Sequence, residues 1–401
     1  MRTATLLAAT SLGLATLIAT PALAQDNEVK VFGRIMLDHT FASADEADED
    51  FSVTEARRLR LGLSGKFGSD VKYKFELNTD SSGDVNAEDA YAQWYPTGDS
   101  WSVIVGQDNT HNSFHELASS RFLMAERAAF TDAFGFDRRL GISVLNDGDN
   151  WTAAAGVHTV NLENDNLNSG WAASARGTYT PINTDDTLVH VGAHWRYRNQ
   201  GEDDGLIRYR QRPLSHGLDR IVSTGNIADE DTLIGLEAYG LAQGGKYWVG
   251  SEYSFLEAES SPGGIAEDAN FGGGMITAGT MFGGRRTYKN GKWDRPKVDN
   301  PVGDGGMGAL LLEARYDTLD LEDDAVDGGE LDTWALHADW YLTKYVHFGA
   351  TGFVSDADLG TVTSGLGSDF ADLVRAGVPS EDVTGIVFRL NVDFGSPTWK
   401  F

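Results

Sequence analysis

The chain has 401 residues, a formal net charge of −28 at pH 7 and no cysteine. The missing cysteines exclude disulfides, thiolate metal sites and thiol nucleophiles, and the acidic balance argues against nucleic acid as a partner. With 47 glycines, 9 prolines and 10% aromatic residues, the composition suits many strands joined by tight turns. It predicts neither a bound metal nor a cofactor.

Residues 1–24 have the composition of a secretory signal peptide. One cation, Arg2, precedes an apolar stretch from Leu6 to Ile18, and Ala22-Leu23-Ala24 is a small-x-small cleavage site. A membrane anchor is the alternative, but the stretch is shorter than the ~20 residues that a spanning helix needs. We therefore expect export, with residues 25–401 as a single domain. Any later membrane crossing must be made of strands, since no later apolar window is long enough.

From residue 28 onward, apolar and polar residues alternate in one segment after another. In the first segment Val31, Ile35 and Leu37 share one face, whereas Arg34 and Asp38 share the other. This period of two is typical of a strand with lipid on one side and water on the other. We expect sixteen such strands, near residues 29–41, 56–67, 71–78, 88–96, 100–107, 138–146, 150–159, 170–180, 186–198, 230–241, 245–256, 272–282, 307–317, 331–341, 344–354 and 384–394.

The connections between these strands mostly alternate in length. The short ones are expected at 68–70, 97–99, 147–149, 181–185, 242–244 and 342–343, and the long ones at 42–54, 81–87, 108–137, 160–169, 199–229, 257–271, 318–330 and 355–383. Short periplasmic turns, long outer loops and an even strand count characterise single-chain bacterial barrels. The pattern predicts an all-β, antiparallel transmembrane barrel in the bacterial outer membrane, in contact with its lipid and lipopolysaccharide.

Residues 283–306 interrupt this regularity. They fall where a short turn is expected, and they are rich in Gly, Lys and Arg. Either this periplasmic turn is long, or it hides a further hairpin and the barrel has eighteen strands. A soluble sandwich is the alternative fold class. It would have to divide the strands between separate cores, and the chain has no linker to separate them.

The last strand has two candidate endpoints. Phe394 closes the alternation, and Phe401 is the final residue, with Pro397 between them. Proline cannot donate a hydrogen bond to a central ladder. The wall therefore either ends at Phe394 with a short tail behind it, or continues as a kinked extension at the periplasmic rim.

Side chains cannot fill a barrel of this size, so we expect a water-filled channel whose selectivity is set by charges in the lumen. Parity places a series of basic residues on the wet face: Arg34, Arg58, Arg60, Lys72, Lys74, His190, His194, Arg196 and Arg198. This series predicts passive diffusion of anions. The alternative is ordinary lumen polarity, balanced by acids such as Glu76 and Asp89, in a weakly selective porin.

Acidic residues gather in two of the expected outer loops. One contains Asp45, Glu46, Asp48, Glu49 and Asp50, and the other contains Asp320, Glu322, Asp323, Asp324, Asp327 and Glu330. A solvated loop is the simpler interpretation. Bridging to lipopolysaccharide through divalent cations is the sharper one.

The loop at 108–137 carries five phenylalanines together with Arg121 and Arg127. It is too apolar to extend freely into water, so we expect it to fold into the barrel, bury its aromatic rings and turn an arginine towards the passage. Packing on the outer rim or on a neighbouring subunit is the alternative. The same loop holds Ser113 beside His111 and His115, a weak signal for a hydrolase.

A second basic segment follows at 208–212. Arg208, Arg210 and Arg212 alternate with Tyr209 and Gln211, which places three guanidinium groups on one face of an extended chain. Such a row can replace the hydration of an anion with paired hydrogen bonds. A basic loop or strand edge without function is the alternative.

Short motifs stand in a characteristic order along the chain. In the first half they are Arg57-Arg58-Leu59-Arg60-Leu61-Gly62-Leu63-Ser64-Gly65, Asp89-Ala90-Tyr91, Val105-Gly106-Gln107, Glu126-Arg127 and Arg138-Arg139-Leu140-Gly141. In the second half they are Arg210-Gln211-Arg212-Pro213-Leu214-Ser215-His216, Thr224-Gly225, Glu252-Tyr253, Gly284-Arg285-Arg286-Thr287-Tyr288 and Glu313-Ala314-Arg315-Tyr316. Together they resemble the phosphate-selective porin O and P family over nearly the whole mature chain.

The resemblance implies a sixteen-stranded outer-membrane barrel, usually a homotrimer, that passes phosphate or polyphosphate along Arg and Lys residues without being an enzyme. By position, Arg34, Arg57 and Arg58 would form the constriction. Asp89 would lie with Arg121 or Arg127 near the central anion site, and the funnel would hold Arg208, Arg210 and Arg212. Parity adds Arg60 and Lys74 to this set of pore-lining residues.

Overall fold

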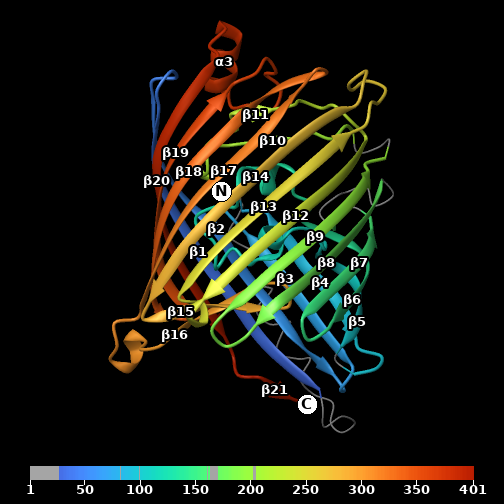
Figure 1. Ribbon diagram of the computed structural model, residues 1–401, viewed down its shortest axis with the longest axis vertical. Coiled ribbons are helices and arrows are strands. Elements are labelled where there is room, and N and C mark those ends of the chain that lie inside the picture. Colours follow the sequence, from blue (N-terminus) through green and yellow to red (C-terminus); the bar gives the residue numbers. More distant parts are fainter. Residues whose placement is uncertain (1–26, 82, 99, 160, 163–169, 202–204) are drawn as a thin grey trace, which may run out of the picture.

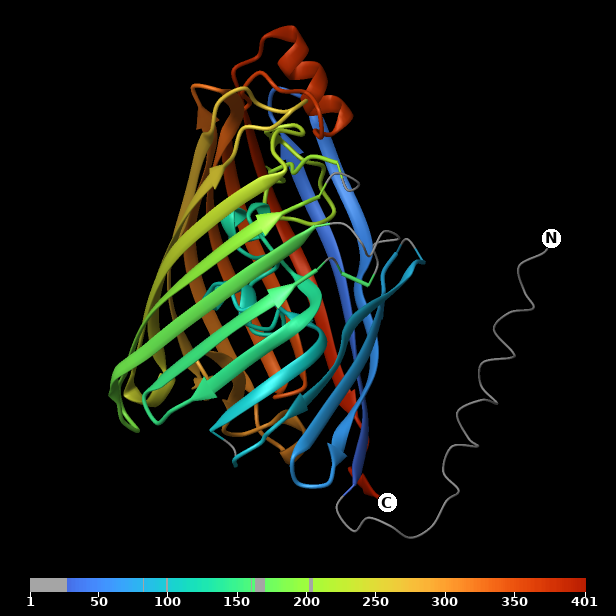
Figure 2. The same cartoon turned by 90° about the vertical axis from the view of Figure 1, so that its right-hand side faces the viewer.

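The structure, a computed structural model, describes residues 27–401 apart from 82, 99, 160, 163–169 and 202–204. The predicted signal peptide, residues 1–24, lies outside the described residues. Within them, β20 pairs back with β1 and closes a wall of sixteen antiparallel strands (Figures 1 and 2). These are β1 (Glu28–Ala44), β2 (Glu49–Phe67), β3 (Val71–Thr79), β4 (Val85–Trp94), β5 (Trp101–Asn109), β6 (Arg138–Asp147), β7 (Trp151–His158), β8 (Trp171–Asn183), β9 (Leu188–Asn199), β12 (Glu230–Ala242), β13 (Tyr247–Ala258), β14 (Ala269–Phe282), β17 (Ala309–Asp323), β18 (Val326–Thr343), β19 (Val346–Asp358) and β20 (Ser380–Gly395).

The alternation of apolar and polar residues in the sequence corresponds to side chains that point alternately out of and into the barrel. On β1, Arg34 and Asp38 are buried inside the barrel, whereas Ile35 and Leu37 are exposed on its outer face. The outer face needs apolar side chains because it meets lipid, and the closed ladder pairs the backbone groups of neighbouring strands with one another instead of with water. The predicted barrel of sixteen strands is confirmed. No helix of the described chain is long and apolar enough to cross a membrane.

The irregular segment 283–306 is a hairpin that does not join the wall. Its strands, β15 (Gly284–Lys289) and β16 (Lys292–Val298), pair with each other in a separate two-stranded sheet, at the end of the barrel where the chain terminates (Figure 1). The alternative of eighteen strands is therefore wrong. The hairpin bends into the barrel, because Trp293 packs against Phe114 and Tyr239 with ring centroids 5.0 and 5.5 Å apart. A short 3-10 turn, Val302–Asp304, follows the hairpin.

Two connections predicted to be long loops are tight turns. β1 and β2 run on to a turn at 45–48, and β17 and β18 run on to a turn at 324–325. The prediction is wrong because these strands continue beyond the lipid, where both faces meet water and the apolar alternation stops. The backbone ladder needs no such alternation. The two acidic groups that were predicted in these outer loops therefore lie largely on strands. Within the second group, Asp320 is directly opposite Glu330.

Three further long connections carry small elements of their own within the described residues. The β5–β6 loop contains α1 (Phe114–Leu117) and α2 (Ala129–Ala133). The β9–β12 loop contains the small β10–β11 sheet (Arg210–Gln211 and Val222–Ser223). The β19–β20 loop carries α3 (Ser368–Ala376), which projects from the outer end (Figure 1). A single 3-10 turn, Gln243–Gly245, joins β12 to β13.

The chain continues past Phe394 as a kinked extension. After Gly395, the chain passes Pro397 and forms β21 (Trp399–Lys400), which pairs with Val29 and Glu28 of β1. This pairing continues the seam between β1 and β20 down to the periplasmic rim. Trp399 and Phe401 are both about half exposed there, at 50% and 58%.

Candidate functional site

The loop between β5 and β6 folds into the interior of the barrel (Figure 2). Both of its helices begin with backbone N–H groups aimed at wall carboxylates. Phe114 donates to Glu237 of β12 at 2.7 Å, and Ala129 donates to Asp317 of β17 at 2.7 Å. The first N–H groups of a helix have no partner within it, so these carboxylates supply the missing acceptors. The loop is thereby held across the lumen.

The aromatic residues of the loop supply its second anchorage. The side chain of Phe114 is fully buried and stacks on Tyr239 of β12 at 3.8 Å between ring centroids. Four further phenylalanines of the loop are buried as well: Phe122, Phe130, Phe134 and Phe136. The wall contributes buried apolar side chains, such as Leu233 and Met275, to the same cluster. Burial of this apolar surface stabilises the loop inside the barrel.

Two neighbouring cavities remain between the loop and the wall. The inner cavity, about 450 Å³, is bounded by strands β1–β6, the loop and the tip of the β15–β16 hairpin. The outer cavity, about 240 Å³, lies between the same loop and residues of the β9–β12 connection. Arg58 and Arg127 line both cavities. The predicted residues in the inner cavity are Arg34, Arg58, Arg60, Lys74, Asp89, Arg121 and Arg127.

Two β-bulges turn adjacent like charges into the lumen. The first bulge is on β2: Met36 and Leu37 of β1 lie opposite Arg58 and Ala56 of β2, so Arg57 is the extra residue. The second is on β4: Phe75 and Leu77 of β3 lie opposite Ala90 and Ala87 of β4, so both Glu88 and Asp89 face Glu76. A bulge shifts the alternation by one residue. Arg57 and Arg58 therefore both face inward, as do Glu88 and Asp89.

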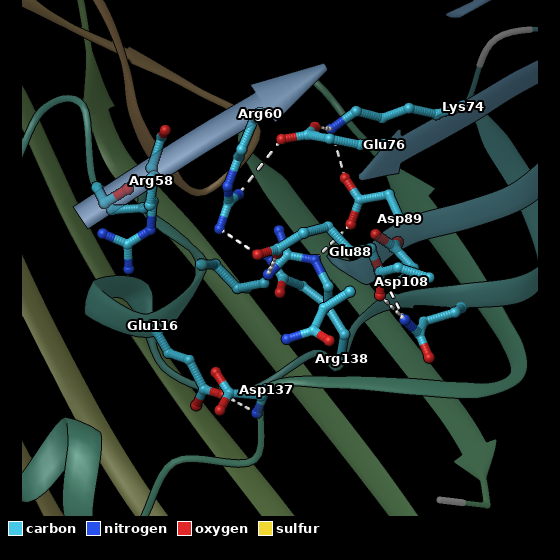
Figure 3. A pocket seen from close by; sticks show the side chains of 18 of the residues that line it. Arg58, Arg60, Lys74, Glu76, Glu88, Asp89, Asp108, Glu116, Asp137 and Arg138 are labelled. Atoms are coloured by element: carbon cyan, nitrogen blue, oxygen red, sulfur yellow. Dashed lines mark hydrogen bonds and ion pairs between the residues drawn. The ribbon is translucent and has the colours of Figure 1, made fainter. Parts of the chain in front are cut away.

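Six side chains of the inner cavity form a continuous ion network (Figure 3). Arg60 contacts Glu88 at 2.5 Å and Glu76 at 3.4 Å. Arg138 contacts Glu88 at 2.7 Å and Asp89 at 2.6 Å, and Lys74 bridges Glu76 and Asp89. The three cations and three carboxylates balance one another. The network therefore links β2, β3, β4 and β6 beside the cavity and carries no net charge of its own.

Arg58 and Arg127 stand apart from this balance. Arg58 lies 3.7 Å from the sulfur of Met36, and Arg127 donates to the backbone carbonyls of His115, Glu116 and Ala118. Within the described residues, neither guanidinium forms an ion pair with a carboxylate. No direct ion pair therefore neutralises either charge at the junction of the two cavities.

Arg57 forms an ion pair with a residue of the loop and is not free to contact a passing ion. Its Nε and Nη2 donate to the two carboxylate oxygens of Glu126 at 2.6 and 2.9 Å. Burial alone would raise the pKa of Glu126, but the charge and hydrogen bonds of Arg57 hold this pKa well below its usual value. Glu126 is therefore ionised at neutral pH, and the pair ties the loop to β2.

Two of the three arginines in the row at 208–212 line the outer cavity. Arg210 and Arg212 do so together with Gln211, whereas Tyr209 is buried outside that lining. The hydroxyl of Tyr209 donates to Asp231 at 2.6 Å, which fixes the segment to β12. Arg208 does not line either cavity in the described residues, and it lies beside Gly365 of the α3 loop.

The sequence of residues 29–358 matches the model of the family described as phosphate-selective porin O and P. The chain belongs to this family. This porin is 33% identical over 348 residues to an uncharacterized protein of Caulobacter vibrioides, with 80% of this chain and 67% of the relative covered.

Solved structures share the fold of this porin at low identity. An anion-selective porin from Comamonas acidovorans matches with a TM-score of 0.56 at 14% identity, covering 92% of this chain and all of that chain (100%). The trimer form of OmpT from Vibrio cholerae matches with a TM-score of 0.54 at 12% identity, covering 91% of this chain and 99% of that chain. The protein is thus a channel-forming porin of the bacterial outer membrane.

Several residues of the porin's inner cavity were not among the predicted site residues. Arg138 and Glu88 complete the ion network, and Lys292 reaches the cavity from the tip of the β15–β16 hairpin. Arg138 stands at the start of a predicted strand, and this position could have indicated that it faces the lumen. No such sequence signal marks Lys292, because its segment lacks the apolar–polar alternation of a wall strand.

The weak hydrolase signal in the loop has a structural explanation. The hydroxyl of Ser113 accepts a hydrogen bond from the backbone N–H of Glu116 at 3.1 Å and so caps α1. His115 contacts Thr131 at 3.4 Å. No hydrogen bond joins Ser113 to either neighbouring histidine in the described part of the loop. Among the described residues, no group of three or more His, Asp or Glu side chains could hold a metal ion.

Proposed function

We propose that this porin conducts small anions, phosphate among them, along a basic path through the outer and inner cavities. The observation that carries the proposal is Arg58, whose charge has no carboxylate partner in the described structure and which lines both cavities. A guanidinium can replace part of an anion's hydration shell with paired hydrogen bonds. The family description supports phosphate as the substrate.

The path runs inward from the outer end of the barrel. Arg210 and Arg212 line the outer cavity, Arg58 and Arg127 stand at the junction, and Arg34 and Arg121 border the inner cavity. Successive sites of moderate strength let an ion advance without being trapped at one of them.

Planar-bilayer recordings test this proposal directly. In a salt gradient the reversal potential should indicate anion preference, and phosphate should block the chloride current. Replacing Arg58 with Glu should reduce the anion preference and weaken the block, whereas Lys246→Glu, the same charge change at an exposed periplasmic turn, should change both much less. Cation preference in the unmodified porin would overturn the proposal.

A weakly selective porin is the second candidate, and the ion network favours it. Its three carboxylates compensate three of the cavity's cations, so the local field is weaker than the number of cations implies. Under this alternative, chloride and phosphate pass in proportion to their mobility. Phosphate then produces no block of the chloride current at any concentration.

We further propose a homotrimer with outer-membrane lipid and lipopolysaccharide around it, exported by cleavage of residues 1–24. The trimer form among the solved porins supports the oligomeric state. Light scattering of the detergent-solubilised protein measures it, and a monomer would contradict it. N-terminal sequencing of the protein from outer membranes should begin at Gln25.

A further inference from the structure

Three arginines from three separate segments converge on one carboxylate at the edge of the inner cavity. Asp393 of β20 lies 3.6 Å from Arg34 of β1, 2.9 Å from Arg121 of the loop and 2.8 Å from Arg295 of the β15–β16 hairpin. Asp393 is the only ion-pair partner of each of these arginines in the described structure. The cluster therefore has an excess of two positive charges.

Two of these arginines line the inner cavity, and the carboxylate does not. Arg34 and Arg121 line the inner cavity together with Ser119 and Ser120, whereas Asp393 and Arg295 lie outside its lining. Arg34 is directed by hydrogen bonds to both serines, at 3.4 and 2.9 Å, and its buried Nε has no hydrogen-bond partner in the described structure. The Nε of Arg34 thus has Asp393 as an ion-pair partner at 3.6 Å but forms no hydrogen bond with it.

Arg295 is held in place by contacts other than Asp393. Its guanidinium lies over the rings of Phe122 and Tyr345, at 5.6 and 4.9 Å from their centroids, and donates to the carbonyl of Lys344 at 2.5 Å. Arg295 therefore competes for Asp393 from a fixed position. How strongly the Asp393 carboxylate interacts with Arg34 and Arg121 therefore depends on how strongly it interacts with Arg295.

We infer that Asp393 is a positioning residue that sets the anion affinity of the inner cavity, an inference that rests on the proposed anion conduction. It orients Arg121 and offsets part of the positive potential of Arg34 and Arg121 from a position outside the cavity lining. A selective channel needs binding that is favourable enough for entry and weak enough for exit. Asp393 weakens anion binding by Arg34 and Arg121, and Arg295 limits this effect by interacting with the same carboxylate.

Two substitutions of opposite sign test this assignment in the full-length porin. Asp393→Asn removes the offset, so phosphate should block the chloride current at about three- to tenfold lower concentration, with longer block events. Arg295→Gln removes the competing cation and leaves Asp393 to the other two arginines. Phosphate should then block less tightly than in the unmodified porin. Asp393→Glu should restore the original block.

The matched control is Asp299→Asn, which removes a carboxylate from an exposed ion pair with Arg285 at the base of the same hairpin, with partners 3.3 Å apart. It should leave the phosphate block unchanged. Equal shifts in Asp393→Asn and Asp299→Asn, or identical block constants in Arg295→Gln and the unmodified porin, would overturn the inference. If Asp393→Asn does not assemble, Arg295→Gln alone decides it. A wild-type channel without phosphate block contradicts the proposed function instead.

Discussion

Arg57 and Glu126 form a two-point ion pair between the barrel wall and the inward loop, with N–O distances of 2.6 and 2.9 Å. Both side chains are largely buried, at 14% and 9% exposure. A bulge in β2 makes the contact possible, because without it Arg57 would face lipid while Arg58 faced the lumen. The pair thus links a local irregularity of the wall to the position of the loop that narrows the channel.

Replacing Glu126 with Gln should destabilise the loop. Removing one partner of a buried pair leaves the other charge uncompensated, which costs about 3–5 kcal/mol. We expect a noisier open-channel current and a lower midpoint in urea unfolding. The double variant Arg57→Met with Glu126→Met should recover much of this loss. A quiet, fully stable Glu126→Gln channel would contradict the role given to the pair.

The same pair predicts how the loop responds to pH. The pKa of Glu126 is held well below its usual value in the folded protein, whereas an unfolded glutamate titrates near about 4.3. A depressed carboxyl pKa contributes stability that is fully present above the unfolded pKa and is lost as pH falls through the folded pKa. Current noise should therefore be constant from pH 8 to pH 5 and rise only in more acidic solution.

Histidines of the loop should not alter this profile. Burial lowers the pKa of His111 to about 3, and burial together with the charge of Arg315 lowers the pKa of His115 well below its usual value. Both rings are thus neutral between pH 8 and pH 5. A step in noise near pH 6.5 that disappears in His111→Gln would show that this histidine is accessible and charged.

Replacing Arg138 with Gln should shift selectivity towards cations. The substitution leaves Glu88 and Asp89 facing the inner cavity with one cation fewer. The anion-to-cation permeability ratio should fall by on the order of two- to fivefold, as measured from reversal potentials. Arg139→Gln is the matched control, because Arg139 lies over the ring of Phe136 and donates to the carbonyl of Thr159 outside that cavity.

The sequence predicted the parts of the site that follow strict alternation. Arg34, Arg60 and Lys74 stand on regularly paired stretches of their strands, so parity alone placed them inward. Parity cannot place Arg57 and Glu88, because a bulge is decided by the register of two strands and leaves no trace in either strand alone. Arg57 entered the predicted set through the family resemblance, and Glu88 did not enter it.

Other features depend on contacts between distant segments. Asp393 follows the parity of the last strand, but nothing local shows that Arg34, Arg121 and Arg295 meet there. Likewise, residues 283–306 show no lipid-facing row, so their sequence does not reveal that the hairpin folds back into the lumen. The strand ends at 45–48 and 324–325 were missed because hydropathy reports lipid contact and not hydrogen bonding.

Replacing Trp293 with Ala should release the β15–β16 hairpin from the lumen. Trp293 is 3% exposed and packs edge-on against Phe114 and Tyr239. Loss of a buried tryptophan costs about 3–5 kcal/mol, while the barrel strands keep their ladder. We expect a larger and more variable conductance with an intact, heat-resistant barrel. Trp151→Ala, which removes a 44% exposed ring, should leave conductance unchanged.

Deleting residues 396–401 should leave barrel assembly intact. β1 pairs with β20 over thirteen residue pairs, from Phe32–Gly395 to Ala44–Val383, whereas it pairs with β21 only at Val29 and Glu28. The short pairing lies beyond Pro397, which interrupts the ladder, so its loss exposes few backbone groups. Electrophoresis of membrane fractions with and without heating reports assembly. If the truncated chain fails to reach the outer membrane while a Trp399→Ala and Phe401→Ala variant assembles, the backbone of this extension is required; if both fail, its aromatic side chains are.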